Sequence, residues 1–193
     1  MNFLAHLHLA HLASSSLTGN LLADFVRGDP DGRWSPAIVA GIQMHRRLDS
    51  LSDHLPEVRA AKQLFTLATR RVAPIALDVI WDHFLARDWS SIHPRQNLPE
   101  FCAMAEQNIA RDLPETPDNF QHLNRLIWQQ RWLERYAQPN NLENVLQQMA
   151  QRRPRLVSLA DCYQDFVANY SELEILFYRF YPRLMARATE KQL

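Results

Sequence analysis

Three segments in the first 90 residues place polar side chains four residues apart, on helix faces that otherwise carry apolar residues. The pairs are Asn20 and Asp24, His45 and Asp49, and Asp78 and Asp82. Residues four apart lie on the same face of a helix. An ionised carboxylate in an apolar interior is unstable unless it is paired or coordinates a cation. We therefore predict that three helices each supply part of one divalent metal site.

The segment 35–51 contains the clearest of these pairs. Its Ser35-Pro36 start is typical of a helix N-terminus. With successive residues 100° apart, His45 and Asp49 fall at the centre of an apolar arc. Gly41, one turn earlier, leaves room for a ligand or a neighbouring helix. The alternative is a buried His–Asp hydrogen bond that only orients a core imidazole.

Carboxylates also face inward in two further segments. Asp78 and Asp82 share one face of a predicted helix at 74–87, where they repel each other unless a cation, an arginine or a proton intervenes. Asp24 is surrounded by apolar residues in the segment that ends near Arg27. If Asp78 and Asp82 are structural, their alternative partners are three arginines, Arg46, Arg70 and Arg71.

These positions define the predicted site. The predicted metal ligands are Asp24, His45, Asp78 and Asp82, and the same four with His6 form the predicted catalytic set. The predicted contacts to substrate phosphate are Asn20, Arg27, Arg46 and Arg71. Arginine binds phosphate bidentately, which is the reason for including the three arginines. Asn20 and Asp49 are also expected to orient the ligands.

The ligand types in this set indicate its chemistry. Oxygen ligands with one or two imidazoles favour manganese, magnesium or iron over a closed structural zinc site. Such a centre is typical of metal-assisted cleavage of a phosphate ester. His6 or His45 would protonate the leaving group, and the sequence does not choose between them.

Composition favours a single all-α domain spanning residues 1–193. Only four glycines occur, all before residue 42, and no linker divides the chain. Most aromatic residues in the second half are expected to pack in the core. The predicted helices are 2–12, 17–27, 35–51, one after Pro56, 74–87, 98–111, 117–136, 140–151, 154–170 and 171–188.

Charge and hydropathy limit the class of protein. The chain has 21 basic and 21 acidic residues, which argues against nonspecific nucleic-acid binding. No run approaches the length of a membrane span, and the N-terminus lacks the features of a signal peptide. Cys102 and Cys162 are too far apart for a CxxC site. We expect a soluble, cytoplasmic protein, and paired arginines such as Arg152-Arg153 suggest an acidic or phosphate-bearing partner.

The chain lacks GxSxG, GxxxxGK[ST], HExxH and GxGxxG motifs, but several of its blocks match a known family. The blocks are Met1–Ala10 (MNFLAHLHLA), Gly19–Gly28 (GNLLADFVRG), Met44–Arg47 (MHRR) with Asp49, Arg70–Pro74 (RRVAP) with Asp78, Trp81–Phe84 (WDHF), Arg152–Leu156 (RRPRL) and Phe180–Arg183 (FYPR). Over nearly its whole length the sequence closely resembles the bacterial acyl carrier protein phosphodiesterases.

This resemblance implies an all-helical, HD-like fold and a manganese-dependent reaction. The implied substrate is holo acyl carrier protein, from which 4'-phosphopantetheine is removed to leave the apo protein, an activity linked to fatty acid biosynthesis. The resemblance places the chain in a non-standard branch of the HD phosphatase and phosphodiesterase superfamily, whose usual motif is a His-Asp dipeptide. This chain has no His-Asp dipeptide, and at Asp82-His83 the order is reversed. Those two side chains project about 100° apart on a helix and do not aim at one ion.

Two alternatives to this implied activity stay open. One is an HD-type enzyme that acts on a nucleotide or another small phosphoester. The other is a carrier-protein-binding module without enzymatic activity, in which the buried acids are structural. The oligomeric state is not predicted.

Overall fold

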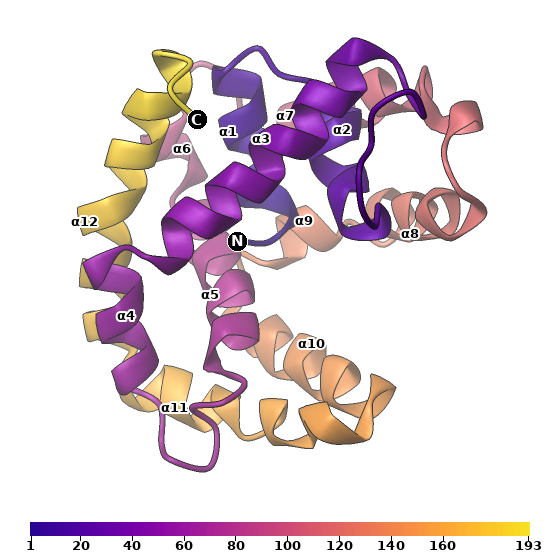
Figure 1. The fold of residues 1–193 in the computed structure, drawn as a ribbon. Helices are drawn as coiled ribbons and strands as arrows, with labels where there is room; N and C mark the ends of the chain where they lie inside the picture. The colour runs from indigo at the N-terminus through magenta and orange to yellow at the C-terminus, as the bar shows by residue number, and fades with distance from the viewer.

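The computed structural model describes residues 1–193, and all its regular elements are helical (Figure 1). The α-helices are α1 (Phe3–Leu12), α2 (Leu17–Leu22), α3 (Pro36–Asp53), α4 (Pro56–Gln63), α5 (Ala73–Arg87), α6 (Trp89–Ile92), α7 (Leu98–Ala110), α8 (Asp118–Gln129), α9 (Trp132–Arg135), α10 (Pro139–Arg152), α11 (Cys162–Ala168) and α12 (Tyr170–Thr189). The short 3-10 helices are η1 (Ala23–Phe25), η2 (Leu113–Glu115) and η3 (Pro154–Leu159). The predicted all-α class is confirmed. None of the helices combines the length and the apolar character needed to cross a membrane.

Three predicted helices are interrupted. The segment 17–27 tightens into η1, which carries Asp24, and ends at Phe25. The segment 117–136 breaks at Arg131, whose left-handed backbone (φ 51°) separates α8 from α9. The segment 154–170 begins as the 3-10 helix η3 before α11 continues it.

Helices α2 and α3 approach each other closely at two glycines. A Cβ atom on Gly19 would lie 2.3 Å from the carbonyl oxygen of Ile38, and one on Gly41 would lie 2.9 Å from that of Ser16. Neither position has space for a side chain. Gly41 was expected to leave room for a ligand or a neighbouring helix, and the structure shows that the neighbouring helix α2 fills this space. The close crossing brings the backbone of α2 against the middle of α3.

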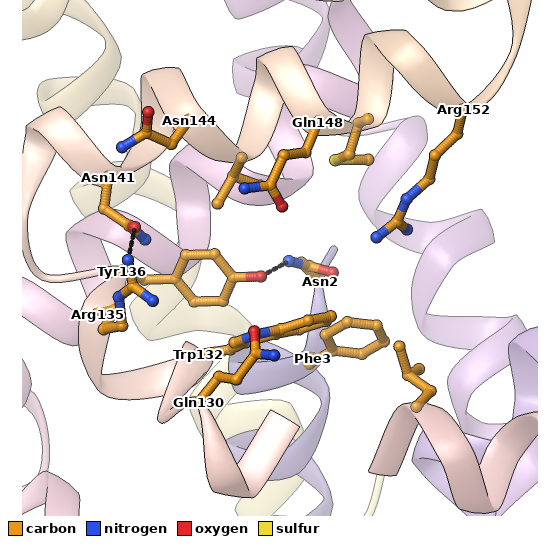
Figure 2. A pocket seen from close by; sticks show the side chains of 13 residues that line it. Asn2, Phe3, Gln130, Trp132, Arg135, Tyr136, Asn141, Asn144, Gln148 and Arg152 are labelled. Atoms are coloured by element: carbon orange, nitrogen blue, oxygen red, sulfur yellow. Dashed lines mark hydrogen bonds between the residues drawn. The ribbon is translucent and has the colours of Figure 1, made fainter. Parts of the chain in front are cut away.

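A pocket lies where the start of α1 meets α9 and α10 (Figure 2). Its volume is about 150 Å³, and it is lined by amide, aromatic and arginine side chains. Asn2 and Phe3 form the part that belongs to the N-terminal segment, and Trp132 and Tyr136 lie close to them across the same opening (Figure 2).

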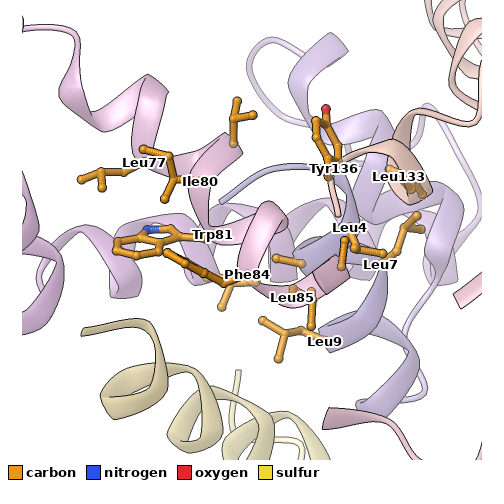
Figure 3. Packing of buried hydrophobic residues seen from close by; sticks show 14 of the residues in the cluster. Leu4, Leu7, Leu9, Leu77, Ile80, Trp81, Phe84, Leu85, Leu133 and Tyr136 are labelled. Carbon is orange, nitrogen blue, oxygen red and sulfur yellow. The ribbon is translucent and has the colours of Figure 1, made fainter. Parts of the chain in front are cut away.

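Helix α5 is buried on nearly all sides at the centre of the core (Figure 3). Trp81 packs against Phe177 and Phe180 of α12, with its ring centroid 5.2 Å from that of Phe180. The buried apolar residues form one continuous cluster with members from α1 to α12, which supports the expectation of a single domain. Because α5 has no polar outer face along most of its length, its ionisable residues need partners inside the protein.

Candidate functional site

Two histidines and an aspartate from α1 and α3 form the tightest cluster of potential metal ligands. The Nε2 atoms of His6 and His45 each lie 3.1 Å from an oxygen of Asp49. The two imidazole rings are stacked, with centroids 3.8 Å apart. One ligand atom from each residue lies within 4.8 Å of the others, so the three side chains can converge on one ion.

Asp24 extends this cluster toward solvent. Its Oδ1 atom lies 3.4 Å from Nε2 of His45, and its side chain is 58% exposed, whereas the His45 side chain is 6% exposed. Asp24 therefore borders the open side of the cluster. The tight turn of η1 brings this carboxylate beside α3.

A backbone contact fixes the orientation of His45. Its Nδ1 atom lies 2.7 Å from the carbonyl oxygen of Asn20, a hydrogen bond in which the imidazole donates. The other nitrogen, Nε2, then faces Asp24 and Asp49. Metal-binding histidines typically use one nitrogen for the metal and the other for a hydrogen bond of this kind.

The two stacked histidines differ in protonation. Burial lowers the pKa of His45, but hydrogen bonds with Asp24 and Asp49 outweigh it and raise the pKa to about 9. Burial lowers the pKa of His6 to about 4, and the nearby charge of His45 adds to this effect. His6 is thus neutral at pH 7, the form of imidazole that binds metals. Its Nδ1 atom is buried without a hydrogen-bond partner.

Asp49 carries the negative charge at the centre of the cluster. Burial favours its protonated form, but hydrogen bonds from His45 and His6 hold its pKa well below the usual range. The α-amino group of Met1, 3.2 Å away, acts in the same direction. Asp49 is therefore ionised and available to a cation throughout the physiological pH range.

Asp78 is connected to the cluster through Met1. Its carboxylate lies 2.9 Å from the α-amino group, which also contacts Asp49. Burial raises the pKa of Asp78, and the ammonium charge opposes this shift. Asp78 thus neighbours the cluster without being part of the His6, His45 and Asp49 set.

Asp82 caps α1 and does not face the cluster, which corrects its prediction as a metal ligand and catalytic residue. Its two oxygens accept hydrogen bonds from the backbone amides of Leu4 and Ala5, at 2.8 and 2.9 Å. The side chain is fully buried, and burial raises its pKa to about 7 despite these bonds. The carboxylate satisfies amides at the N-terminus of α1, where negative charge is favourable. Asp82 therefore positions the helix that carries His6.

The neighbouring His83 faces a third set of partners. Its Nδ1 atom lies 2.8 Å from the carbonyl oxygen of Tyr136, and its Nε2 atom lies 3.0 Å from the hydroxyl of Tyr170. The expectation that Asp82 and His83 do not converge on one ion is confirmed.

Comparisons with known proteins identify the family. The family model described as "Acyl carrier protein phosphodiesterase" matches residues 1–184. The chain belongs to this family. It is 58% identical to the acyl carrier protein phosphodiesterase of Serratia proteamaculans (strain 568), and 55% identical to those of Enterobacter sp. (strain 638) and Escherichia coli O157:H7, with all of each chain covered. No solved structure matches. Membership confirms the expected class of enzyme, a phosphodiesterase.

In this acyl carrier protein phosphodiesterase family member, two predicted substrate contacts bind other parts of the chain, and Asn20 thereby has the orienting role that was also predicted for it. Asn20 is fully buried, and its side-chain amide donates hydrogen bonds to Ser15 and Ser16. Its backbone carbonyl oxygen accepts the hydrogen bond from His45. Arg46 donates to the carbonyl oxygens of Val26 and Gly28, at 2.7 and 2.8 Å, and so holds the loop after Asp24. Polar groups of the chain itself accept hydrogen bonds from both side chains, and the contact of these residues with phosphate stays a prediction.

Arg27 and Arg71 are exposed, so their proposed contact with phosphate stays a prediction. For Asp49 the sequence predicts only an orienting role, whereas in the structure its carboxylate lies between both histidines and contacts each of them. Its four-residue spacing from His45 is the signal for that role. The ion pairs of the Met1 α-amino group with Asp49 and Asp78 could not be predicted from side-chain spacing, because this group is not a side chain.

Proposed function

We propose that this protein is a metal-dependent phosphodiesterase that hydrolyses holo acyl carrier protein to apo carrier protein and 4'-phosphopantetheine. The observation that carries the proposal is the convergence of His6, His45 and Asp49, with Asp24 beside them at the solvent-exposed edge. The names of the full-length relatives supply the carrier protein as substrate. The proposed location is the cytoplasm, in keeping with two free, buried cysteines.

The residues fit a divalent cation such as manganese, with magnesium and iron as alternatives. His6, His45 and Asp49 would hold it, and Asp24 would complete the set from the open side. Two imidazoles with carboxylates suit manganese or iron, and the Nε2 atoms of both histidines lie beside Asp49, close enough for the three side chains to share one ion. When bound, the cation supplies Lewis-acid stabilisation of phosphoryl oxygens and a more acidic water.

The surrounding residues orient this set. The carbonyl of Asn20 fixes the ring of His45, and Asp82 fixes the start of α1 and with it His6. Arg46 keeps the loop after Asp24 in place. Such supporting contacts matter because small displacements of ligands reduce metal affinity and turnover.

Exposed arginines would contact the substrate. Arg27 and Arg71 are proposed to bind the phosphate, since a free guanidinium binds phosphate bidentately. The exposed Arg152, Arg153 and Arg155 at the end of α10 and in η3 would face the acidic carrier protein and accelerate its association.

Mass spectrometry of the carrier protein tests the proposal. The purified enzyme is incubated with holo carrier protein, with manganese or with a chelator, alongside the variants His45→Ala and Gln43→Ala. Gln43 is exposed on α3 and serves as the matched control. We expect a mass loss equal to the prosthetic group only with metal and only for wild type and Gln43→Ala.

Other outcomes separate the remaining functions. Turnover of small phosphoesters without release of the prosthetic group would indicate a different substrate. Carrier-protein binding that needs no metal, with no turnover, would indicate a binding module. Either result would overturn the proposed reaction.

A further inference from the structure

The pocket between α1, α9 and α10 has a lining that the metal centre does not use. One face of α10 borders it at helical spacing through Asn141, Asn144, Val145, Gln148, Met149 and Arg152. Gln148 and Arg152 point from α10 toward the rings of Tyr136 and Phe3 (Figure 2). The pocket therefore has a polar wall on α10 and an aromatic floor opposite.

Some of the amides around the pocket already have partners. Asn2 donates to the hydroxyl of Tyr136 at 2.9 Å, and Asn141 accepts from Arg135 at 3.0 Å. By contrast, Asn144 and Gln148 are exposed on the α10 wall, where their carboxamides are accessible to a ligand. A carboxamide both donates and accepts hydrogen bonds, so these two residues complement a ligand that carries amide groups.

The pocket lies next to the candidate metal centre along the chain. Its lining residue Asn2 directly follows Met1, whose carbonyl oxygen lies 3.1 Å from Nε2 of His6. The α-amino group of Met1 lies 3.2 Å from Asp49. Because consecutive Cα atoms are about 3.8 Å apart, the residue that lines the pocket and the residue that contacts the cluster are immediate neighbours in space.

We propose that this pocket binds the pantetheine arm of the prosthetic group, an inference that rests on the proposed function. The arm is a flexible chain with two secondary amides, a hydroxyl group and a dimethyl-substituted carbon. Asn144 and Gln148 pair with its amides, and the apolar faces of Trp132 and Phe3 contact its methyl and methylene groups. A fatty acyl chain fits less well, since it would cover these carboxamides without giving them partners.

Binding of free pantetheine, which lacks the phosphate, tests this assignment without turnover. The affinity is measured by titration with wild type, with the double variant Asn144→Ala/Gln148→Ala, and with Gln147→Ala. Gln147 is exposed on the same helix but does not line the pocket, so it is the matched control. We expect the double variant to bind about fivefold or more weakly, the size of one or two lost hydrogen bonds, and the control to bind like wild type.

Kinetics provide the second readout. The double variant should raise KM for holo carrier protein but leave hydrolysis of bis(4-nitrophenyl) phosphate, a diester without the arm, unchanged. Unchanged affinity for pantetheine in the double variant, or no binding to wild type, would overturn the assignment of the pocket.

The two proposals fail in different ways. If wild type releases the prosthetic group but the double variant keeps its KM and its pantetheine affinity, only the pocket assignment is wrong. If wild type releases no prosthetic group, the proposed function fails, and pantetheine binding still decides what the pocket recognises.

Discussion

His45 uses its two ring nitrogens for different purposes. Nδ1 donates to the backbone of Asn20, and Nε2 faces the carboxylates of Asp24 and Asp49. Without a cation these carboxylates raise the pKa of His45 to about 9, so a proton occupies the position. Metal binding and proton binding therefore compete at Nε2, and metal affinity should fall as pH falls.

Substitution of Asp49 tests the role of its charge. Asp49→Asn keeps the size of the side chain but removes the anion between His6 and His45. We expect turnover and manganese affinity to fall by at least about 100-fold, because the set loses a ligand and not only a supporting contact. Steady-state kinetics and manganese titration measure both, with Gln43→Ala as the control. Full activity in Asp49→Asn would contradict the ligand assignment.

Asp82 should affect stability in a pH-dependent way. Its pKa is raised to about 7 in the folded protein, above the value of about 3.9 in an unfolded chain. Between these values the folded state binds more protons, so this residue makes wild type less stable as pH rises. Asp82→Asn removes this pH dependence of the free energy of unfolding but weakens the cap of α1 by about 1 kcal/mol. In urea unfolding from pH 4 to 7, the variant should have a lower free energy of unfolding than wild type, by an amount that shrinks with rising pH. A constant or growing difference would refute this account.

At the scale of elements, the crossing of α2 and α3 connects packing to the site. Gly19 and Gly41 let the two backbones approach, and the same approach brings the carbonyl of Asn20 to His45. A methyl group at Gly19 meets backbone atoms alone, and one at Gly41 meets backbone atoms and the Cβ atom of Ser16, which cannot rotate away from the backbone. The helices must therefore separate to accept it.

Gly41→Ala should weaken both folding and the site. We expect a loss of about 1–3 kcal/mol in the free energy of unfolding, typical of overpacking, with weaker manganese binding because α2 moves away from His45. Ser50→Ala, at an exposed position of the same helix, is the control. Chemical denaturation and metal titration give the two readouts, and a Gly41→Ala protein with wild-type values in both would disprove the packing argument.

The same elements explain which predictions from sequence succeeded. Helix α3 begins at Ser35-Pro36 and has one buried face, so capping and periodicity were enough to pair His45 with Asp49. Helix α5 is buried on nearly all sides, so an inward-facing position did not identify what Asp82 would contact. The start of α1 satisfies that carboxylate, and such a partner distant in sequence leaves no sign in local spacing.

At the scale of the whole molecule, His8 connects α1, the first helix, to α12, the last one. It is fully buried, and its Nδ1 atom lies 2.8 Å from the hydroxyl of Tyr181 in α12. Burial lowers its pKa to about 3, and the nearby His93 and His11 contribute to the shift. Folding therefore keeps this imidazole neutral at a pH where an unfolded chain would protonate it.

This contact predicts sensitivity to acid. Between about pH 6.5 and 3 the unfolded state binds the extra proton, so the contribution of His8 to stability should fall as pH falls through this range. His8→Asn keeps a polar partner for Tyr181 without a titratable group, so the unfolding free energy of wild type should fall relative to that of the variant as pH falls. Thermal or urea unfolding between pH 4 and 7 measures the two slopes, and equal slopes would exclude His8 as the source.

The central claim, that α1 and α3 together form a metal centre, is tested most directly by anomalous X-ray diffraction from crystals soaked in manganese. We predict an anomalous peak within bonding distance of His6, His45 and Asp49, with Asp24 at its open side. The same soak of Asp49→Asn crystals should give a much weaker peak. A wild-type crystal with no peak there, or with its only peak elsewhere in the molecule, would contradict the account.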